Sequence, residues 1–266
     1  KKELTITDVV FIVAPRINAA GRMEHGHFAV KLLTETDITA AEKQASEIND
    51  FNQDRRDTDK QITEEALKQI EVQKEQNRLT TVVYNENWHK GVIGIVASRL
   101  TETYYRPTLV FTKSGDKLAA SARSVRDFDI YNALENCSEH IEQFGGHKYA
   151  AGLTLKEENY EAFKQAFEDE VQKTIDKNLL VPEIKIDAQI DLNDITPKFY
   201  RILKQFAPFG PENMTPVFMT DNLKDTGYGK CVGEDKTHLR ITVQQPQSNR
   251  FVGIGFGMGD KLDLIS

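Results

Sequence analysis

The chain has 266 residues, of which 39% are hydrophobic and 28% are charged, with 16 glycines and 8 prolines. This length favours two compact domains, or one large domain with an appendage, and the composition excludes collagen-like and low-complexity proteins. The net charge of −7 argues against binding nucleic acid by bulk charge, although it is compatible with a local basic groove.

The compartment follows from what the sequence lacks. No apolar run approaches the ~20 residues that cross a bilayer, and the first residues carry no signal-peptide core. Cys137 and Cys231 are far apart and form no CxxC pair, so neither a disulfide scaffold nor a zinc knuckle is indicated. We therefore expect a cytoplasmic protein without a membrane segment. Because the first residue is not Met, we also expect a fragment of a longer protein.

The first 73 residues divide into two patterns. Residues 5–33 place apolar runs around a loop-like segment, APRINAAGR. Residues 39–73 are polar, contain no Gly or Pro, and carry only a narrow apolar stripe. Such a stripe is typical of a long helix that connects two bodies.

The rest of the chain changes character twice. From Leu79 it alternates predicted strands (79–84, 108–112, 117–122) with predicted helices (from about 91, then 129–136, 138–144 and 157–177), and GGHKYAAGLTL reads as a loop followed by a strand. This order is typical of an α/β layer. After Pro182, short strands (184–188, 217–219, 239–243, 251–254) and one helix (197–206) favour a small β-barrel or sandwich that ends before it closes.

Arg16, Asn18 and Arg22 in APRINAAGR form the first candidate binding segment. An arginine fork matches phosphate oxygens, and small neighbours let a ligand come close. The alternative is a helix start whose arginines pair with Glu24 or Asp37.

The run WHKGVIG at residues 88–94 follows a predicted strand and opens a helix, so its free N–H groups could bind an anion. It matches neither GxGxxG nor GxxxxGK[ST]. A tight turn with a packing tryptophan is the alternative.

Two further runs combine polar side chains with small residues. In Ser121-Ala-Arg123-Ser124, the first hydroxyl and the guanidinium share one side of a strand end, where an α/β ligand crevice or a solvated surface pair could lie. In Gly145-Gly146-His147-Lys148, paired glycines carry a His and a Lys into a strand of small residues, and this density of glycine favours function over a structural histidine. Catalytic triads have no support, and His25 and His27 are a weak metal candidate.

Taken in order, APRINAAGR, WHKGVIGIVASRL, SARS, FGGHKYAAG and FAPFGPENMTPVF resemble the C-terminal half of the RecJ family of single-strand DNA exonucleases, in the DHH phosphoesterase superfamily. The resemblance covers nearly the whole chain. It implies an α/β plus β fold: residues 1–38 end a DHH catalytic domain, 39–78 form a connecting helix, 79–178 a DHH-associated domain and 182–266 an incomplete OB-fold.

The resemblance also implies a 5′→3′ exonuclease of DNA repair and recombination. Its two Mn²⁺ or Mg²⁺ ions are bound by an N-terminal domain with an Asp-His-His signature that this sequence lacks, so no metal ligand is expected here and the fragment alone should be inactive. Expected partners are single-stranded DNA, single-strand binding protein and a RecQ-type helicase, with no membrane.

The roles of individual residues follow from the same resemblance. Ser121 and Arg123 would hold the terminal 5′ phosphate, with Ser124 and Lys148 beside the substrate. His147 would be catalytic, and with Gly145 and Gly146 would face the scissile phosphate. Arg16, Asn18 and Arg22 would line the path of the strand, and Trp88 or Tyr149 would stack on a base. Two alternatives stay open: a DHH oligoribonuclease or nucleotide phosphatase, and a non-catalytic nucleic-acid-binding module.

Overall fold

The computed structural model describes residues 4–265. The chain divides into two compact units at the boundary between Pro182 and Glu183. Among the described residues, no helix combines the length and the apolar character that crossing a membrane requires.

The first unit begins with helices only, so the expected loop at APRINAAGR is wrong. Helix α1 (Ile6–Asp8), a π-helical turn (Val9–Val13) and α2 (Ala14–Met23) follow one another, and α3 (His27–Thr34) comes next. Pro15 lies in the first turn of α2, directly after the π-helical turn. Ala19 and Ala20 are fully buried, so the small residues that resemble a loop serve close helix packing.

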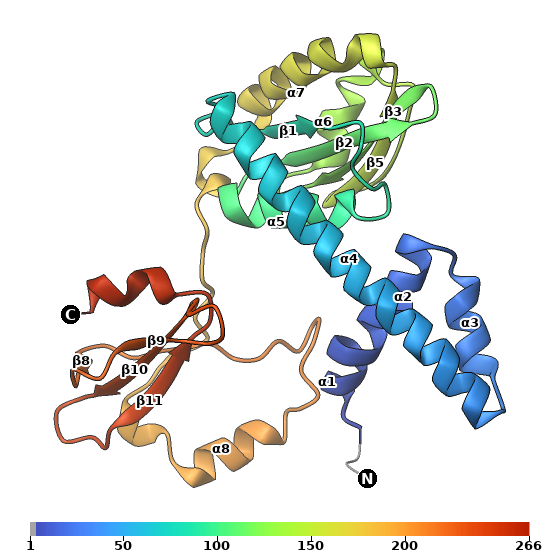
Figure 1. Cartoon of the computed structure of the whole chain (residues 1–266). Helices are drawn as coiled ribbons and strands as arrows, with labels where there is room; N and C mark the ends of the chain where they lie inside the picture. The colour runs from blue at the N-terminus through green and yellow to red at the C-terminus, as the bar shows by residue number, and fades with distance from the viewer. Residues whose placement is uncertain (1–3, 266) are drawn as a thin grey trace. The chain divides into compact units, whose positions relative to one another are not determined.

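Helix α4 (Ile38–Val72) is the long helix that the polar segment predicted. The Asp37 carboxylate caps it by accepting a hydrogen bond from the Ala40 N–H at 2.8 Å. Its apolar stripe enters two separate clusters: Ile48 packs with Ala20 and Ala29, and the later part of the stripe packs under α5. Figure 1 shows α4 running from the N-terminal helices to the sheet of the same unit.

A mixed five-stranded sheet forms the second half of this unit, in the order β1-β2-β3-β5-β4. Strands β1 and β2 are parallel, and the other neighbours are antiparallel. The elements in chain order are β1 (Thr81–Tyr84), α5 (Ile93–Tyr104), β2 (Thr108–Ser114), β3 (Lys117–Arg123), α6 (Ile130–Glu135), β4 (Gln143–His147), β5 (Ala150–Leu155) and α7 (Tyr160–Thr174), with 3₁₀ turns at Ser138–His140, Glu157–Asn159 and Lys177–Leu180.

The two faces of the sheet differ because side chains alternate along each strand. On one face, Phe111 packs against Phe163 and Phe167 of α7, and all three are fully buried. On the other face, Val83 and Val110 pack against α5 and the end of α4. Over β5 and β4, however, this second face carries only partly buried or exposed residues.

The helix predicted at 138–144 is wrong. Only Ser138–His140 is helical, as a 3₁₀ turn, and Gln143 and Phe144 begin β4. The segment has ordinary helix-forming residues, but pairing of β4 with β5 takes precedence over local propensity. The presumed loop around GGH is therefore the end of a strand.

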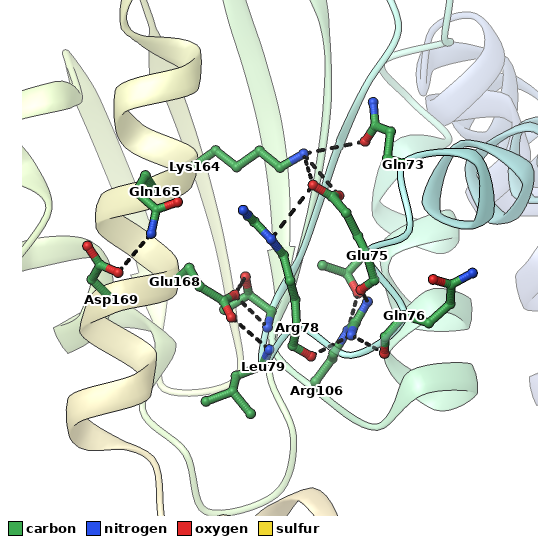
Figure 2. Close-up of polar contacts among 12 residues, drawn as sticks. Gln73, Glu75, Gln76, Arg78, Leu79, Arg106, Lys164, Gln165, Glu168 and Asp169 are labelled. Carbon is green, nitrogen blue, oxygen red and sulfur yellow. Dashed lines mark hydrogen bonds and ion pairs between the residues drawn. The ribbon is translucent and has the colours of Figure 1, made fainter.

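A buried polar network ties the segment after α4 to the sheet and to α7 (Figure 2). Lys164 of α7 forms an ion pair with Glu75 at 2.8 Å, and the Glu168 carboxylate accepts hydrogen bonds from the backbone N–H groups of Leu79 and Thr80. The Arg106 guanidinium, 3% exposed as a residue, donates to the backbone carbonyls of residues 75, 76 and 78. These contacts satisfy backbone groups that would otherwise be buried without partners.

The second unit is a small β structure. Strands β8 (Lys224–Asp225), β9 (Lys230–Val232), β10 (His238–Gln244) and β11 (Phe251–Gly255) form an antiparallel sheet around β10, and β6 (Ala188–Gln189) pairs with β7 (Phe218–Met219) in parallel. Helix α8 (Pro197–Lys204) and 3₁₀ turns at Leu192–Asp194 and Gly259–Leu264 complete it.

One expectation for this unit, the strand at residues 184–188, needs correction. Ile184 and Ile186 belong to no strand and are exposed, because pairing begins only at Ala188. Within residues 183–265 the two sheets do not close into a barrel, in agreement with the incomplete fold that the sequence predicts.

Candidate functional site

Four of the expected site residues, Ser121, Arg123, Gly145 and His147, gather on the open face of the sheet. The strand registers align Ser121 with Gly152 and Gly145 in one row across β3, β5 and β4. The next row aligns Arg123 with Ala150 and His147. Residues directly opposite one another point to the same face, so polar side chains flank a floor of glycine and alanine.

Arg123 and Ser121 form the polar edge of this floor. The Arg123 guanidinium donates to the Ser121 hydroxyl at 3.0 Å and to the Ala122 carbonyl at 2.7 Å. A Cβ added to Gly94, in the first turn of α5, would lie 3.0 Å from both the Arg123 Nη2 and the Ser121 Oγ atoms. Because Gly94 has no side chain, the Arg123 guanidinium can pack against the start of α5.

Arg22 joins the site from the end of α2. Its guanidinium donates to the Gly91 carbonyl at 3.1 Å, and a Cβ on Gly91 would lie 2.0 Å from the Arg22 carbonyl oxygen. Gly91 therefore lets the end of α2 approach the loop before α5. This close approach is what brings Arg22 near Arg123.

The two arginines make an electropositive centre. Burial lowers the pKa of the Arg123 guanidinium, and the positive charge of Arg22 lowers this pKa further. Within residues 4–265, neither guanidinium has a carboxylate within ion-pair distance. Arginine stays charged in proteins, so these unpaired guanidiniums are suited to an anionic ligand, and phosphate matches their planar fork.

His147 lies at the opposite edge of the floor and is exposed. Its Nδ1 atom accepts a hydrogen bond from the Tyr149 N–H at 3.3 Å. In the neutral ring this assigns the proton to Nε2, which is then a free donor beside the floor. An imidazole in this state can donate to a phosphate oxygen.

The paired glycines have different roles. Gly146 lies in β4 opposite Ala151, with φ +153°, and a Cβ there would lie 2.3 Å from the Ala150 carbonyl oxygen, so this strand position requires glycine. A Cβ on Gly145 would meet nothing within 4 Å. Gly145 therefore leaves the floor open, and a hollow of ≈ 840 Å³ lies there between β3, β5, β4 and Lys90.

The structure does not bring every predicted residue to this site. On α2, Asn18 and Arg22 are four residues apart and share a helix face, whereas Arg16 donates to Asn49 of α4 at 2.6 Å. The Ser124 hydroxyl donates to the Phe128 carbonyl at 2.8 Å, and Lys148 lies 3.7 Å from Asp127. Their roles in binding stay predictions.

The run at residues 88–94 serves packing at its tryptophan. Trp88 is 5% exposed and donates to Glu65 at 2.8 Å, so the structure supports the packing interpretation and its stacking on a base is ruled out in this conformation. Tyr149 is 44% exposed and stays a stacking candidate.

Lys90 also borders the hollow, although the sequence did not predict this. In the run WHKGVIG the glycines and the helix start carry the signal for an anion site, and nothing local distinguishes this lysine from a solvent-exposed one. Its ammonium donates to the Ser114 hydroxyl at 3.1 Å beside the hollow.

No group of three or more His, Cys, Asp or Glu in residues 4–265 is arranged to hold a metal ion. The residues described here therefore do not fit a divalent-metal centre, and His25 and His27 do not gain the third ligand that such a site requires.

Family models assign both parts of the chain. Residues 76–173 match the DHHA1 domain and residues 186–266 match the RecJ OB domain. The chain therefore combines a DHH-associated domain with an OB domain of the RecJ type, and it belongs to the RecJ family as a C-terminal part. The finer division into residues 1–38, 39–78, 79–178 and 182–266 stays a prediction.

Individual relatives agree with this assignment. The chain is 34% identical over 256 residues to the single-stranded-DNA-specific exonuclease RecJ of Bacillus subtilis (strain 168), covering 95% of this chain and 32% of that protein. It is 32% identical to the protein of the same description from Escherichia coli (strain K12), covering 91% and 43%. The crystal structure of RecJ with Mn²⁺ from Thermus thermophilus matches with a TM-score of 0.79 and 27% identity, covering 93% of this chain and 36% of that one.

The chain thus spans about a third to two fifths of the length of these relatives. A second structure of the Thermus thermophilus protein is described as a complex with Mg²⁺.

Proposed function

We propose that this chain is the substrate-binding part of a metal-dependent 5′→3′ single-stranded-DNA exonuclease of DNA repair and recombination. The observation that carries the proposal is the pair of guanidiniums, Arg22 and Arg123, without carboxylate partners beside a glycine floor. The names of the relatives support the substrate and the reaction, and the OB domain favours RecJ over a DHH oligoribonuclease. Single-strand binding protein and a RecQ-type helicase stay candidate partners from the resemblance alone.

In this proposal Arg123, Ser121 and Arg22 bind the terminal 5′ phosphate. The glycine floor at Gly145 and Gly152 lets the DNA backbone come close, because no side chain stands in its way. The Nε2–H of His147 donates to an oxygen of the scissile phosphate, whose charge grows in the transition state. Two Mn²⁺ or Mg²⁺ ions, bound by a region outside this chain, would supply the activated water.

The end-group test uses Arg123→Ala in a protein that includes the N-terminal region. Removing a charged hydrogen-bond donor from a half-buried site should lower kcat/KM on 5′-phosphorylated single-stranded DNA. The ratio of the wild-type and variant values should correspond to a loss of roughly 2–4 kcal/mol of transition-state stabilisation. The loss should shrink on the same strand with a 5′ hydroxyl. Equal losses on both substrates would show that Arg123 serves packing or a different phosphate.

A second expectation is that residues 1–266 alone do not hydrolyse single-stranded DNA in the presence of Mn²⁺, whereas a protein extended to include the metal-binding region does. The reason is that residues 4–265 contain no cluster of ligands for a metal ion. Release of nucleotides from a labelled strand measures the activity. Robust Mn²⁺-dependent hydrolysis by the purified chain, at a rate that follows the protein through chromatography, would contradict the proposal.

A further inference from the structure

A second group of arginines lies away from the glycine floor, midway along α4. Here a hollow of ≈ 510 Å³ is lined by Arg55 and Arg56 of α4 and by Arg99 of α5. Lys60 adds a fourth positive charge to its wall. None of these residues contributes to the floor between β3, β5 and β4.

The acidic residues of the wall do not cancel these charges. Asp59 is 1% exposed, and both of its carboxylate oxygens accept from Arg99, at 2.8 and 2.7 Å. Because this bidentate pair uses only two of the five N–H groups of Arg99, the half-exposed guanidinium is fixed in direction and keeps donors for a ligand. The Asp57 carboxylate accepts two hydrogen bonds from Gln53, and Glu64 is the remaining acid.

Arg55 and Arg56 lack such partners. The only side chain to which Arg55 donates, among residues 4–265, is Asn52, at 3.3 Å, and its Nε atom is buried without an acceptor. No carboxylate in those residues lies within ion-pair distance of either guanidinium. A buried donor without a partner costs free energy, which a bound acceptor recovers.

Arg22 connects this hollow with the glycine floor. Burial lowers the pKa of the Arg55 guanidinium, the Asp59 carboxylate raises it in part, and the positive charges of Arg22, Arg56 and Arg99 lower it. Arg22 has the same effect on the pKa of Arg123. Arg22 is therefore close enough to both Arg55 and Arg123 for its charge to act on each.

We propose that Arg55, Arg56 and Arg99 form a second phosphate-binding site, which holds an internal phosphodiester of the single strand whose 5′ phosphate lies at Arg123. The inference rests on the proposed function, because it takes single-stranded DNA as the ligand. Guanidinium forks without carboxylate partners match phosphate oxygens in geometry and charge. An internal phosphate contact contributes affinity that does not depend on base sequence or on the end group.

The test measures binding of fluorescent oligo(dT) to residues 1–266 by anisotropy across a series of salt concentrations, with a 5′ phosphate or a 5′ hydroxyl. The double variant Arg55→Gln/Arg56→Gln should weaken binding about tenfold on both oligonucleotides. It should also reduce the slope of log Kd against log salt by about 0.7 for each phosphate that the variant no longer neutralises. Arg123→Ala should instead weaken binding mainly of the 5′-phosphorylated strand. Arg99 is left intact because its removal would strand the buried Asp59 carboxylate.

Lys43→Gln/Lys68→Gln is the matched control, since it also removes two exposed positive charges from the same helix, outside the hollow. Far-UV circular dichroism confirms that each variant is folded. Unchanged affinity and slope in the double variant, with the end-group effect of Arg123→Ala intact, would overturn this inference and leave the proposed function standing. A second measurement is the rise in melting temperature that inorganic phosphate causes in the wild-type chain. If the double variant loses this rise but binds the oligonucleotides as the wild type does, the inference is also overturned, because the hollow would then be a site for a small anion. Failure of the wild-type chain to bind either oligonucleotide would overturn both.

Discussion

At the scale of single residues, the state of His147 is set by one backbone contact. Because its Nδ1 accepts from the Tyr149 N–H, the neutral ring carries its proton on Nε2. Its side chain is exposed, so it adds little to the apolar core. A substitution of this histidine can therefore affect catalysis while leaving the stability of the fold almost unchanged.

His147→Ala is therefore expected to lower kcat by about 10²-fold or more in a protein that includes the N-terminal region, as for the loss of one donor to a developing charge. The melting temperature should stay nearly unchanged, and DNA binding should fall far less than kcat. Steady-state kinetics, a melting curve and a binding titration measure the three quantities. A melting temperature lower by several degrees, together with normal activity of the folded remainder, would assign His147 a structural role.

At the scale of elements, the β4–β5 hairpin shows why two adjacent glycines have different functions. Gly146 is required by the backbone of β4, because its φ of +153° and the nearby Ala150 carbonyl exclude a Cβ. Gly145 faces open space on the side where the substrate is proposed to lie. One position therefore serves the fold and the other serves access.

Gly145→Ala and Gly146→Ala make a matched pair. Gly146→Ala should destabilise the unit by about 1–3 kcal/mol or more, because it combines strained backbone with a clash. Gly145→Ala should keep the melting temperature within about one degree and weaken oligonucleotide binding, since its methyl group occupies the floor. Thermal unfolding and anisotropy separate these effects. Equal destabilisation by both changes would show that Gly145 also serves the fold.

The elements also show which parts of the structure the sequence could predict. Regular periodicity predicted α4, the strands β2 and β3, and the buried face of α7 from Tyr160 to Val171, because these signals lie within one element. The same alternation put Ser121 and Arg123 on one side. The pairing of Gln143 and Phe144 with β5, and the approach of Arg22 to Gly91, depend on distant partners that no local pattern contains. The helical nature of APRINAAGR was missed because its small residues serve contact with another helix.

At the scale of the whole molecule, the two units differ in how much apolar surface they bury. The first contains large, fully buried side chains on both faces of its sheet, including Phe111, Phe163 and Leu100. Within residues 183–265, the apolar side chains that are buried are Leu192 and Leu239. Large apolar residues such as Phe256 are exposed in the same unit. Since apolar burial is the main favourable contribution to folding, the second unit should be much less stable than the first.

We therefore expect two unfolding transitions, with residues 183–265 melting first. Trp88, the only tryptophan of the chain, is buried in the first unit, so its fluorescence should follow only the second transition, whereas circular dichroism should follow both. Leu239→Ala should lower the midpoint temperature of the first transition and leave the fluorescence midpoint unchanged. Removing a buried leucine costs about 2–5 kcal/mol of stability, and this cost falls on the unit that contains the leucine. Leu109→Ala, in the core of the first unit, should shift the fluorescence midpoint instead. A single transition that coincides for both probes and responds to both substitutions would instead show that the two units unfold as one.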